Sequence, residues 1–223
     1  MPTERFNGDH KEGGPMLDFL ERKLIRWAVP RVPKWLETQH LTLLTLVWCV
    51  AIMGFSWLAR SDETWLWMVS FFIICQYLTD ALEGAVGRHR RSGLVKWGYY
   101  MDHLLDYFFL CAVLIGYAML TSYQYPMLRF FVLALCGGYM VNSFLAFGAT
   151  HEFRLVHLGL GPTELRLVFI LINLSILFFG KTHLAPALPY VLGFCFLGLC
   201  YIVYKTQRDL WMRDMEDKRK KEL

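Results

Sequence analysis

The sequence predicts an all-α fold: a polytopic bundle of six transmembrane helices with an N-terminal amphipathic interfacial helix. Hydrophobic residues make up 56% of the 223 residues and charged residues only 19%, which is too apolar for an ordinary soluble domain. The apolar residues gather in long blocks, and the positive charges concentrate in alternate connectors between them. These observations favour a membrane protein with several spans over a single membrane anchor.

Six apolar blocks reach or approach the roughly 20 residues that a helix needs to cross a bilayer. We expect spans at residues 40–59, 64–82, 103–120, 127–149, 165–179 and 184–204. The block at 165–179 is the shortest of them. Together the blocks define a predicted six-helix transmembrane catalytic domain over residues 39–204.

The residues before the first span divide into two predicted segments. Residues 1–16 are polar and lack the apolar region of a signal peptide, so we expect a flexible cytosolic leader. Within residues 17–38, apolar residues recur at helical spacing among charged ones, up to Pro30. This pattern predicts an amphipathic helix in the membrane interface or, equally, a helix packed against the bundle.

The positive charges predict the membrane topology. Of the 23 Lys and Arg residues, all but Arg60, Arg129 and Lys181 lie before the first span, after the second, at the connector between the fourth and fifth (Arg154 and Arg166), or after the last. By the positive-inside rule both termini are cytosolic, including the charged tail at 205–223. Six spans agree with this, because an even number of spans leaves both termini on the same side.

Four carboxylates stand near the predicted cytosolic ends of the second and third spans. Asp80 and Glu83 are three residues apart, and Asp102 and Asp106 are four apart, so each pair shares one helix face. The short connector between the two spans allows antiparallel helices. The four acids are therefore expected to converge at one membrane depth.

Carboxylates gathered this close to hydrocarbon repel one another unless a cation neutralises them. Oxygen ligands alone suit Mg²⁺ or Mn²⁺, and two such ions could grip a pyrophosphate. Gly84 leaves room for a nucleotide or a neighbouring helix, and Arg88 can pair with a phosphate. An interfacial belt of salt bridges to nearby Arg and Lys is the structural alternative, but the spacing of the whole set favours a metal site.

The stretch 80–106 resembles the 27-residue signature of the CDP-alcohol phosphotransferase family, D-x2-D-G-x2-A-R-x8/9-G-x3-D-x3-D. The matching positions are Asp80, Gly84, Arg88, Gly98, Asp102 and Asp106. Two positions depart from the signature, because Glu83 stands where the family usually has Asp and Gly87 where it usually has Ala. Glu83 keeps the carboxylate but adds a methylene group.

The resemblance implies an enzyme of phospholipid synthesis that moves a substituted phosphate group from a CDP-linked donor to an alcohol and releases CMP. It assigns the metals to Asp80, Glu83 and Asp102, with Asp106 as a further metal ligand and the base. It implies membrane lipids as partners, a homodimer and no nucleic-acid partner, and the positive-inside rule predicts an active site at the cytosolic face.

The same resemblance assigns the nucleotide to Gly84, Arg88 and Gly98. His103 is a second candidate for the catalytic base, because the choline and ethanolamine branch of the family often has Asp-His at this point. The alternative for His103 is a histidine at the membrane interface that makes one hydrogen bond.

The predicted fourth connector is unusually polar for a short cytosolic loop. Its Gly-Pro-Thr-Glu stretch at 161–164 resembles one in the choline and ethanolamine branch, where Glu164 could face a cationic head group. Ordinary helix-start chemistry explains the same residues. Arg154 and Arg166 could bind the phosphate of an acceptor, or simply orient the helix.

Two donor classes stay open for a transferase. CDP-choline or CDP-ethanolamine donating to a diacylglycerol-type acceptor is slightly favoured by His103 and Glu164, and CDP-diacylglycerol donating to a polar alcohol is the other. Two further functions compete with these: a six-span transporter, and a catalytically impaired relative that only binds nucleotide. No repeat relates the two halves of the sequence, which disfavours the transporter.

Overall fold

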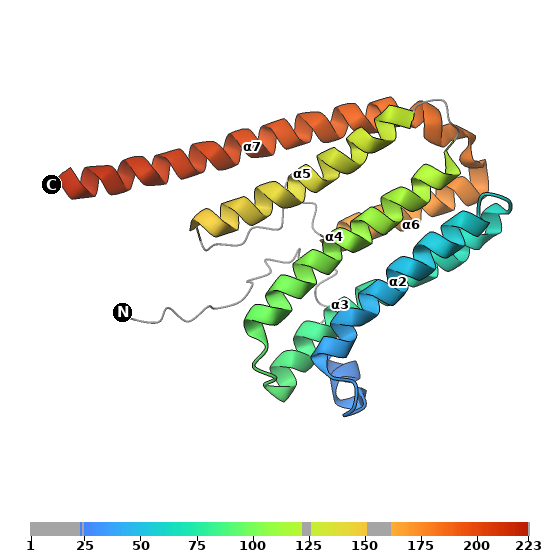
Figure 1. Ribbon diagram of the computed structural model, residues 1–223, viewed down its shortest axis with the longest axis horizontal. Coiled ribbons are helices and arrows are strands. Elements are labelled where there is room, and N and C mark those ends of the chain that lie inside the picture. The colour runs from blue at the N-terminus through green and yellow to red at the C-terminus, as the bar shows by residue number, and fades with distance from the viewer. Residues whose placement is uncertain (1–22, 24, 122–125, 151–161, 223) are drawn as a thin grey trace. The chain divides into compact units, whose positions relative to one another are not determined.

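A computed structural model describes residues 23, 25–121, 126–150 and 162–222, and all regular structure in those ranges is helical (Figure 1). The long helices are α2 (Thr38–Leu58), α3 (Leu66–Arg90), α4 (Val95–Leu120), α5 (Pro126–Thr150), α6 (Pro162–Phe179) and α7 (Leu184–Glu222). Short 3₁₀ turns are η1 (Val29–Arg31), η2 (Glu63–Trp65) and η3 (Lys181–His183). The all-α prediction is confirmed.

Five helices of the described ranges are long and apolar enough to cross a membrane, namely α2, α3, α4, α5 and α7. The fifth predicted span corresponds to α6, an 18-residue helix that carries Glu164 in its first turn. Since α6 is not among the five, the count of six spans stays a prediction. Several helices of this kind make the chain an integral membrane protein.

The helices form two compact units, and the first contains α2, α3, α4 and α6. In this unit α2 packs against both α3 and α4, and α3 also packs against α6 (Figure 1). Residues at the centre are fully buried and mostly aliphatic: Ile52, Leu66, Ile73, Val86 and Val113. Burial of such side chains removes apolar surface from contact with lipid and fixes the helices side by side.

Helices α2 and α4 pack closely together at Gly116. A Cβ atom at this position would lie 2.5 Å from the Ser56 hydroxyl oxygen and 3.0 Å from its Cβ. Only a residue without a side chain fits between the two helices here.

A buried polar network fixes α6 against its neighbours. The Asn173 amide donates to the Ser70 hydroxyl of α3 at 3.0 Å. The Tyr117 hydroxyl of α4 lies 3.0 Å from the Asn173 side-chain oxygen and 2.8 Å from the Phe169 carbonyl. Because buried polar groups are costly unless paired, these bonds select one register of α6 along α3 and α4.

The segment predicted as an interfacial helix is only partly described, since residues 17–22 and 24 lie outside the described ranges. Residues 25–28 are helical and lead into η1. Val29 is buried against Leu41 of α2 and Val86 of α3. The described portion therefore packs against the bundle, which was the alternative to a helix lying free in the interface.

Arg90 ties this N-terminal segment to the end of α3. Its guanidinium donates to the carbonyls of Leu36 at 2.8 Å and Val32 at 2.9 Å. Helix α2 begins at Thr38, two residues after Leu36, with a capping box between Glu37 and His40. These hydrogen bonds thereby connect the segment before the N-terminus of α2 to the C-terminus of α3 at one end of the unit.

Exposed aromatic side chains mark both ends of the first unit. Trp57, Trp65 and Trp67 lie exposed around the connector between α2 and α3. Trp35, Trp97 and Tyr100 lie exposed at the opposite ends of the helices. Aromatic rings of this kind favour the head-group level of a bilayer, so the two groups are placed as interfacial belts.

The second unit contains α5 and α7, which pack along each other. The Tyr139 hydroxyl donates to the Cys195 carbonyl at 2.8 Å, and a Cβ at Gly138 would lie 2.9 Å from Leu199. Helix α7 does not stop at the end of its apolar stretch but continues to Glu222. The charged tail is thus helical through residue 222.

A candidate metal centre between α3 and α4

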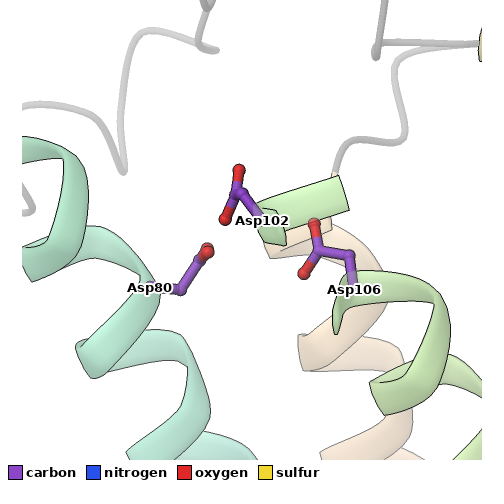
Figure 2. A group of neighbouring side chains, drawn as sticks. All are labelled: Asp80, Asp102 and Asp106. Atoms are coloured by element: carbon purple, nitrogen blue, oxygen red, sulfur yellow. The ribbon is translucent and has the colours of Figure 1, made fainter. Parts of the chain in front are cut away.

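Three aspartate side chains from two helices point toward one another in the first unit (Figure 2). Asp80 comes from α3, and Asp102 and Asp106 come from α4. One carboxylate oxygen from each lies within 4.8 Å of the other two. The predicted convergence of these three acids at one depth agrees with this geometry.

Helix periodicity produces this arrangement. Asp102 and Asp106 are separated by four residues, slightly more than one turn, so both face α3. The connector between α3 and α4 is short, and Arg91 at the end of α3 adopts a left-handed conformation with φ of 52° that ends the helix. The two helices then run antiparallel and bring Asp80 opposite the α4 pair.

The solvent exposure of the three aspartate side chains increases from Asp80 to Asp106 to Asp102. The side chain of Asp80 is 11% exposed, that of Asp106 23% and that of Asp102 30%. The cluster is therefore enclosed on the Asp80 side and most open at Asp102, which is the side from which a ligand would enter.

Glu83 is buried on α3, but the group of three acids that could hold an ion does not include it. Its carboxylate approaches Gly98 of α4, where a Cβ atom would lie 3.9 Å from Oε1. That is an ordinary contact, so Gly98 adjoins Glu83 without being required for space. The metal role predicted for Glu83 stays a prediction.

His103 is buried on α4, one residue after Asp102. Its Nδ1 lies 2.6 Å from the Tyr99 carbonyl, and its ring packs 4.2 Å from the Tyr99 ring. Because a carbonyl only accepts hydrogen bonds, Nδ1 carries the proton and Nε2 is the basic nitrogen of the neutral ring. The hydrogen bond to Tyr99 agrees with the prediction of a histidine that makes one structural hydrogen bond. A neutral ring with its proton on Nδ1 would also leave Nε2 able to act as a base.

Arg166 reaches the cluster from α6. Its Nη2 lies 3.1 Å from Asp80 Oδ2 and 3.1 Å from Asp106 Oδ1. The residue is only 5% exposed. The described ion pairs of Arg166 are thus with carboxylates of the predicted metal site, and its predicted role toward an acceptor phosphate stays a prediction.

Gln76 belongs to the site and was not among the residues singled out from the sequence. Its side-chain oxygen accepts a 2.7 Å hydrogen bond from Arg166 Nε. Gln76 lies four residues before Asp80 in an otherwise apolar run, so the two share a helix face. An uncharged polar residue inside a span, in register with a conspicuous acid, was the signal that could have identified it.

Two of the predicted nucleotide residues, Gly84 and Arg88, lie along the exposed end of α3, and the third, Gly98, lies in the first turn of α4. Arg88 and Gly84 are both exposed, and a Cβ at Gly84 would meet the Arg88 guanidinium at 3.3 Å. The Arg88 side chain therefore folds back over Gly84, where its charge is available to an anion. Among the head-group candidates, Glu164 lies in the first turn of α6, and Arg154 lies outside the described residues.

The three aspartates fit a hard divalent cation. Ligand oxygens around Mg²⁺ at about 2.1 Å stand roughly 3 to 4.2 Å apart in an octahedron. The cluster oxygens lie within 4.8 Å of one another, so pairs at this limit would need to close by up to about 1.8 Å to reach the shorter spacing. A set made only of oxygens suits Mg²⁺ or Mn²⁺ and not zinc.

The comparison with known families agrees with this chemistry. The family model described as CDP-alcohol phosphatidyltransferase matches residues 40–201, which is most of the chain and includes all three aspartates. No curated protein and no solved structure is significantly similar to the chain. The matched range and the signature at 80–106 together place the chain in the CDP-alcohol phosphatidyltransferase family, whose members transfer a phosphate-linked group from a CDP-alcohol to an alcohol.

Proposed function

We propose that the protein catalyses metal-dependent transfer of a substituted phosphate group from a CDP-linked donor to an alcohol, releasing CMP, as a step of phospholipid synthesis. The observation that carries this proposal is the convergence of Asp80, Asp102 and Asp106 within 4.8 Å. Burying three like charges together is unfavourable, and the single positive charge of Arg166, paired with Asp80 and Asp106, balances only part of it.

The aspartates would hold Mg²⁺ or Mn²⁺ against the pyrophosphate of the donor. When bound, such an ion neutralises charge on the phosphate oxygens and stabilises the departing CMP. Asp80 is the most enclosed ligand and fixes the inner side of the site, whereas Asp102 is the most open and would meet the donor first. Glu83 is proposed as a further ligand, brought into reach by its longer side chain.

Asp106 is the proposed base. It accepts the proton of the acceptor hydroxyl while that oxygen attacks the phosphorus attached to the donor's alcohol. The new bond joins this phosphorus to the acceptor oxygen, and the bond to the bridging oxygen breaks, so CMP leaves with the electron pair. His103, with Nε2 as its basic nitrogen, is the second candidate for the base.

The nucleotide would lie over the exposed end of α3. Arg88 supplies a positive charge there, and the absence of side chains at Gly84 and Gly98 leaves room beside the helices. The distribution of positive charge along the sequence supports a cytosolic location for this end of the bundle, where a soluble CDP-donor would be available. Asp102 lies only two residues beyond Tyr100 of the aromatic belt, so the site is within reach of both water and lipid.

CDP-choline or CDP-ethanolamine is the proposed donor and a diacylglycerol-type lipid the proposed acceptor. His103 and the stretch that contains Glu164 support this choice by their likeness to that branch of the family. Arg154, Glu164 and Arg166 are carried forward as proposed contacts of the acceptor or head group. A homodimer is proposed from the family alone.

The test is an assay of CMP release by purified protein in detergent or proteoliposomes. CDP-choline and CDP-ethanolamine are each paired with diacylglycerol, and CDP-diacylglycerol is paired with inositol phosphate, glycerol phosphate and serine. CMP formed from CDP-choline or CDP-ethanolamine, and only when diacylglycerol is present, supports the proposed donor class. Release from CDP-diacylglycerol instead reverses the donor assignment, and nucleotide binding without release from any pair identifies an inactive relative.

A further inference from the structure

Arg166 supplies a positive charge beside the aspartate cluster in the protein without a bound metal. Its Nη2 stands 3.1 Å from oxygens of both Asp80 and Asp106, and so bridges the two helices that build the cluster. The side chain of Arg166 is 6% exposed. A guanidinium shared between two carboxylates in a site with little water offsets much of their mutual repulsion.

Three contacts hold Arg166 independently of the carboxylates. Its Nε donates to Gln76 at 2.7 Å, and Gln76 itself is only 1% exposed. The guanidinium carbon lies 5.6 Å from the centre of the Phe109 ring and 5.8 Å from that of Tyr77. Anchored in this way, the charge is a fixed part of the site and not a surface side chain that happens to pair.

Helix α6 is also fixed in register beside the cluster. Asn173, seven residues after Arg166 and therefore on the same face, is fully buried and bonds to Ser70 of α3. Its partner Tyr117 holds α6 to α4. The position of Arg166 between Asp80 and Asp106 thus follows from the packing of three helices.

We propose that Arg166 is a positioning residue that acts as the resident counter-cation of the cluster. It holds the Asp80 and Asp106 side chains close together in the metal-free protein, and it opposes the divalent ion by charge when that ion binds. The inference rests on the proposed metal site. It predicts that removing the charge weakens the metal-free fold while tightening metal binding.

The test uses purified full-length protein, with Mn²⁺ alone as the probe. The variants are Arg166→Met, which removes the charge, and Asn173→Leu, a matched control that breaks a buried hydrogen bond on the same face of α6. Thermal unfolding is followed in EDTA and in saturating Mn²⁺, and Mn²⁺ affinity is measured by electron paramagnetic resonance. Neither readout depends on turnover.

For Arg166→Met we expect a lower melting temperature in EDTA, a larger rise on adding Mn²⁺ than in wild type, and Mn²⁺ affinity about tenfold tighter. Asn173→Leu should lower the melting temperature equally in both conditions and leave Mn²⁺ affinity unchanged. If Arg166→Met behaves like Asn173→Leu, or binds Mn²⁺ more weakly than wild type, the proposal is overturned and Arg166 is merely structural.

Arg166→Lys decides the matter if Arg166→Met does not fold. Lysine keeps the charge but cannot reproduce the fork that joins Gln76 to the aspartates. We expect its Mn²⁺ affinity to stay within about threefold of wild type, and a change of tenfold or more would refute the role of charge. Failure of the wild-type protein to bind Mn²⁺ would instead reject the metal site itself. This outcome distinguishes an error in the proposed metal site from an error in the role proposed for Arg166.

Discussion

Arg166 of α6 and Asp80 of α3 lie 3.1 Å apart although 86 residues separate them in the chain. The contact joins the signature stretch of the family to a helix outside it. The site is therefore completed by three helices, and changes in α6 are expected to affect the chemistry of α3 and α4.

Asp106→Asn should remove most of the activity. The amide keeps the shape of the carboxylate but neither accepts the acceptor's proton nor contributes negative charge to a metal. Loss of a general base alone typically costs about 10² to 10⁴ in rate, and loss of a metal ligand adds to this. The measurement is CMP release under saturating donor and Mg²⁺.

The companion variant is His103→Ala. It is expected to retain more activity than Asp106→Asn, because His103 already donates Nδ1–H to Tyr99 and lies outside the group of three acids. Near-normal turnover by Asp106→Asn together with an inactive His103→Ala would transfer the role of base to the histidine.

Glu83→Asp should keep part of the activity. The substitution restores the residue usual in the family and preserves the charge, but the shorter side chain changes the reach toward a metal. We expect a changed preference between Mg²⁺ and the larger Mn²⁺, measured as the ratio of CMP release with each ion. An unchanged ratio would argue that Glu83 is not a metal ligand.

Gly87→Ala is the matched control, because it restores the other unusual position of the signature. Its Cβ would lie 3.5 Å from Thr38 Cγ2, which is ordinary van der Waals contact. Full activity with an unaltered metal preference is therefore expected for this variant.

Gly116→Ala should destabilise the first unit by about 1–3 kcal/mol through overpacking. Its new Cβ would stand 2.5 Å from the Ser56 hydroxyl oxygen, so α2 and α4 must separate. Gly54→Ala on α2 meets nothing within 4 Å and should not destabilise the protein. Thermal unfolding in detergent compares the two.

A double-mutant cycle tests whether contact with Ser56 causes the destabilisation by Gly116→Ala. Ser56→Gly in the Gly116→Ala background should recover part of the lost stability, because it vacates the space that the new methyl group needs. Additive losses in the double variant would show that the clash with Ser56 is not the reason.

Both chain ends should be cytosolic. Cysteines introduced as Lys218→Cys and Arg60→Cys, on opposite predicted sides, are labelled in intact cells with a membrane-impermeant maleimide, with unsubstituted protein as background. Lys218→Cys should react only after permeabilisation, and Arg60→Cys before it, if the protein sits in the plasma membrane. The reverse pattern would invert the proposed topology.

Much of the fold was predictable because hydropathy and helix periodicity are local properties of the sequence. Each predicted span lies within or close to a helix. The predicted block 64–82 nevertheless ends eight residues before α3 does, at Arg90. Hydropathy marks where a helix meets lipid, whereas the helix itself continues through the polar signature residues until Arg91 turns left-handed.

The site was predictable only where its geometry is local. The spacing of Asp102 and Asp106 and the antiparallel turn before them predicted the cluster. The placement of Arg166 against Asp80 and Gln76 was not predictable, because it depends on the register of α6, which long-range bonds such as Asn173 to Ser70 determine. A short polar pattern carries no information about such a partner 90 residues away.

The most direct test of the account compares wild type with Asp102→Asn for CMP release in proteoliposomes, with Mg²⁺ or with EDTA, in the presence of a CDP-donor and its alcohol. Asp102 is the most exposed member of the cluster, so its substitution removes a ligand while leaving the Arg166 contacts to Asp80 and Asp106 in place. We predict Mg²⁺-dependent release by wild type, none in EDTA, and a loss of at least about 100-fold in Asp102→Asn. Undiminished release by wild type in EDTA, or by Asp102→Asn with Mg²⁺, would contradict the claim that these aspartates form a catalytic metal centre.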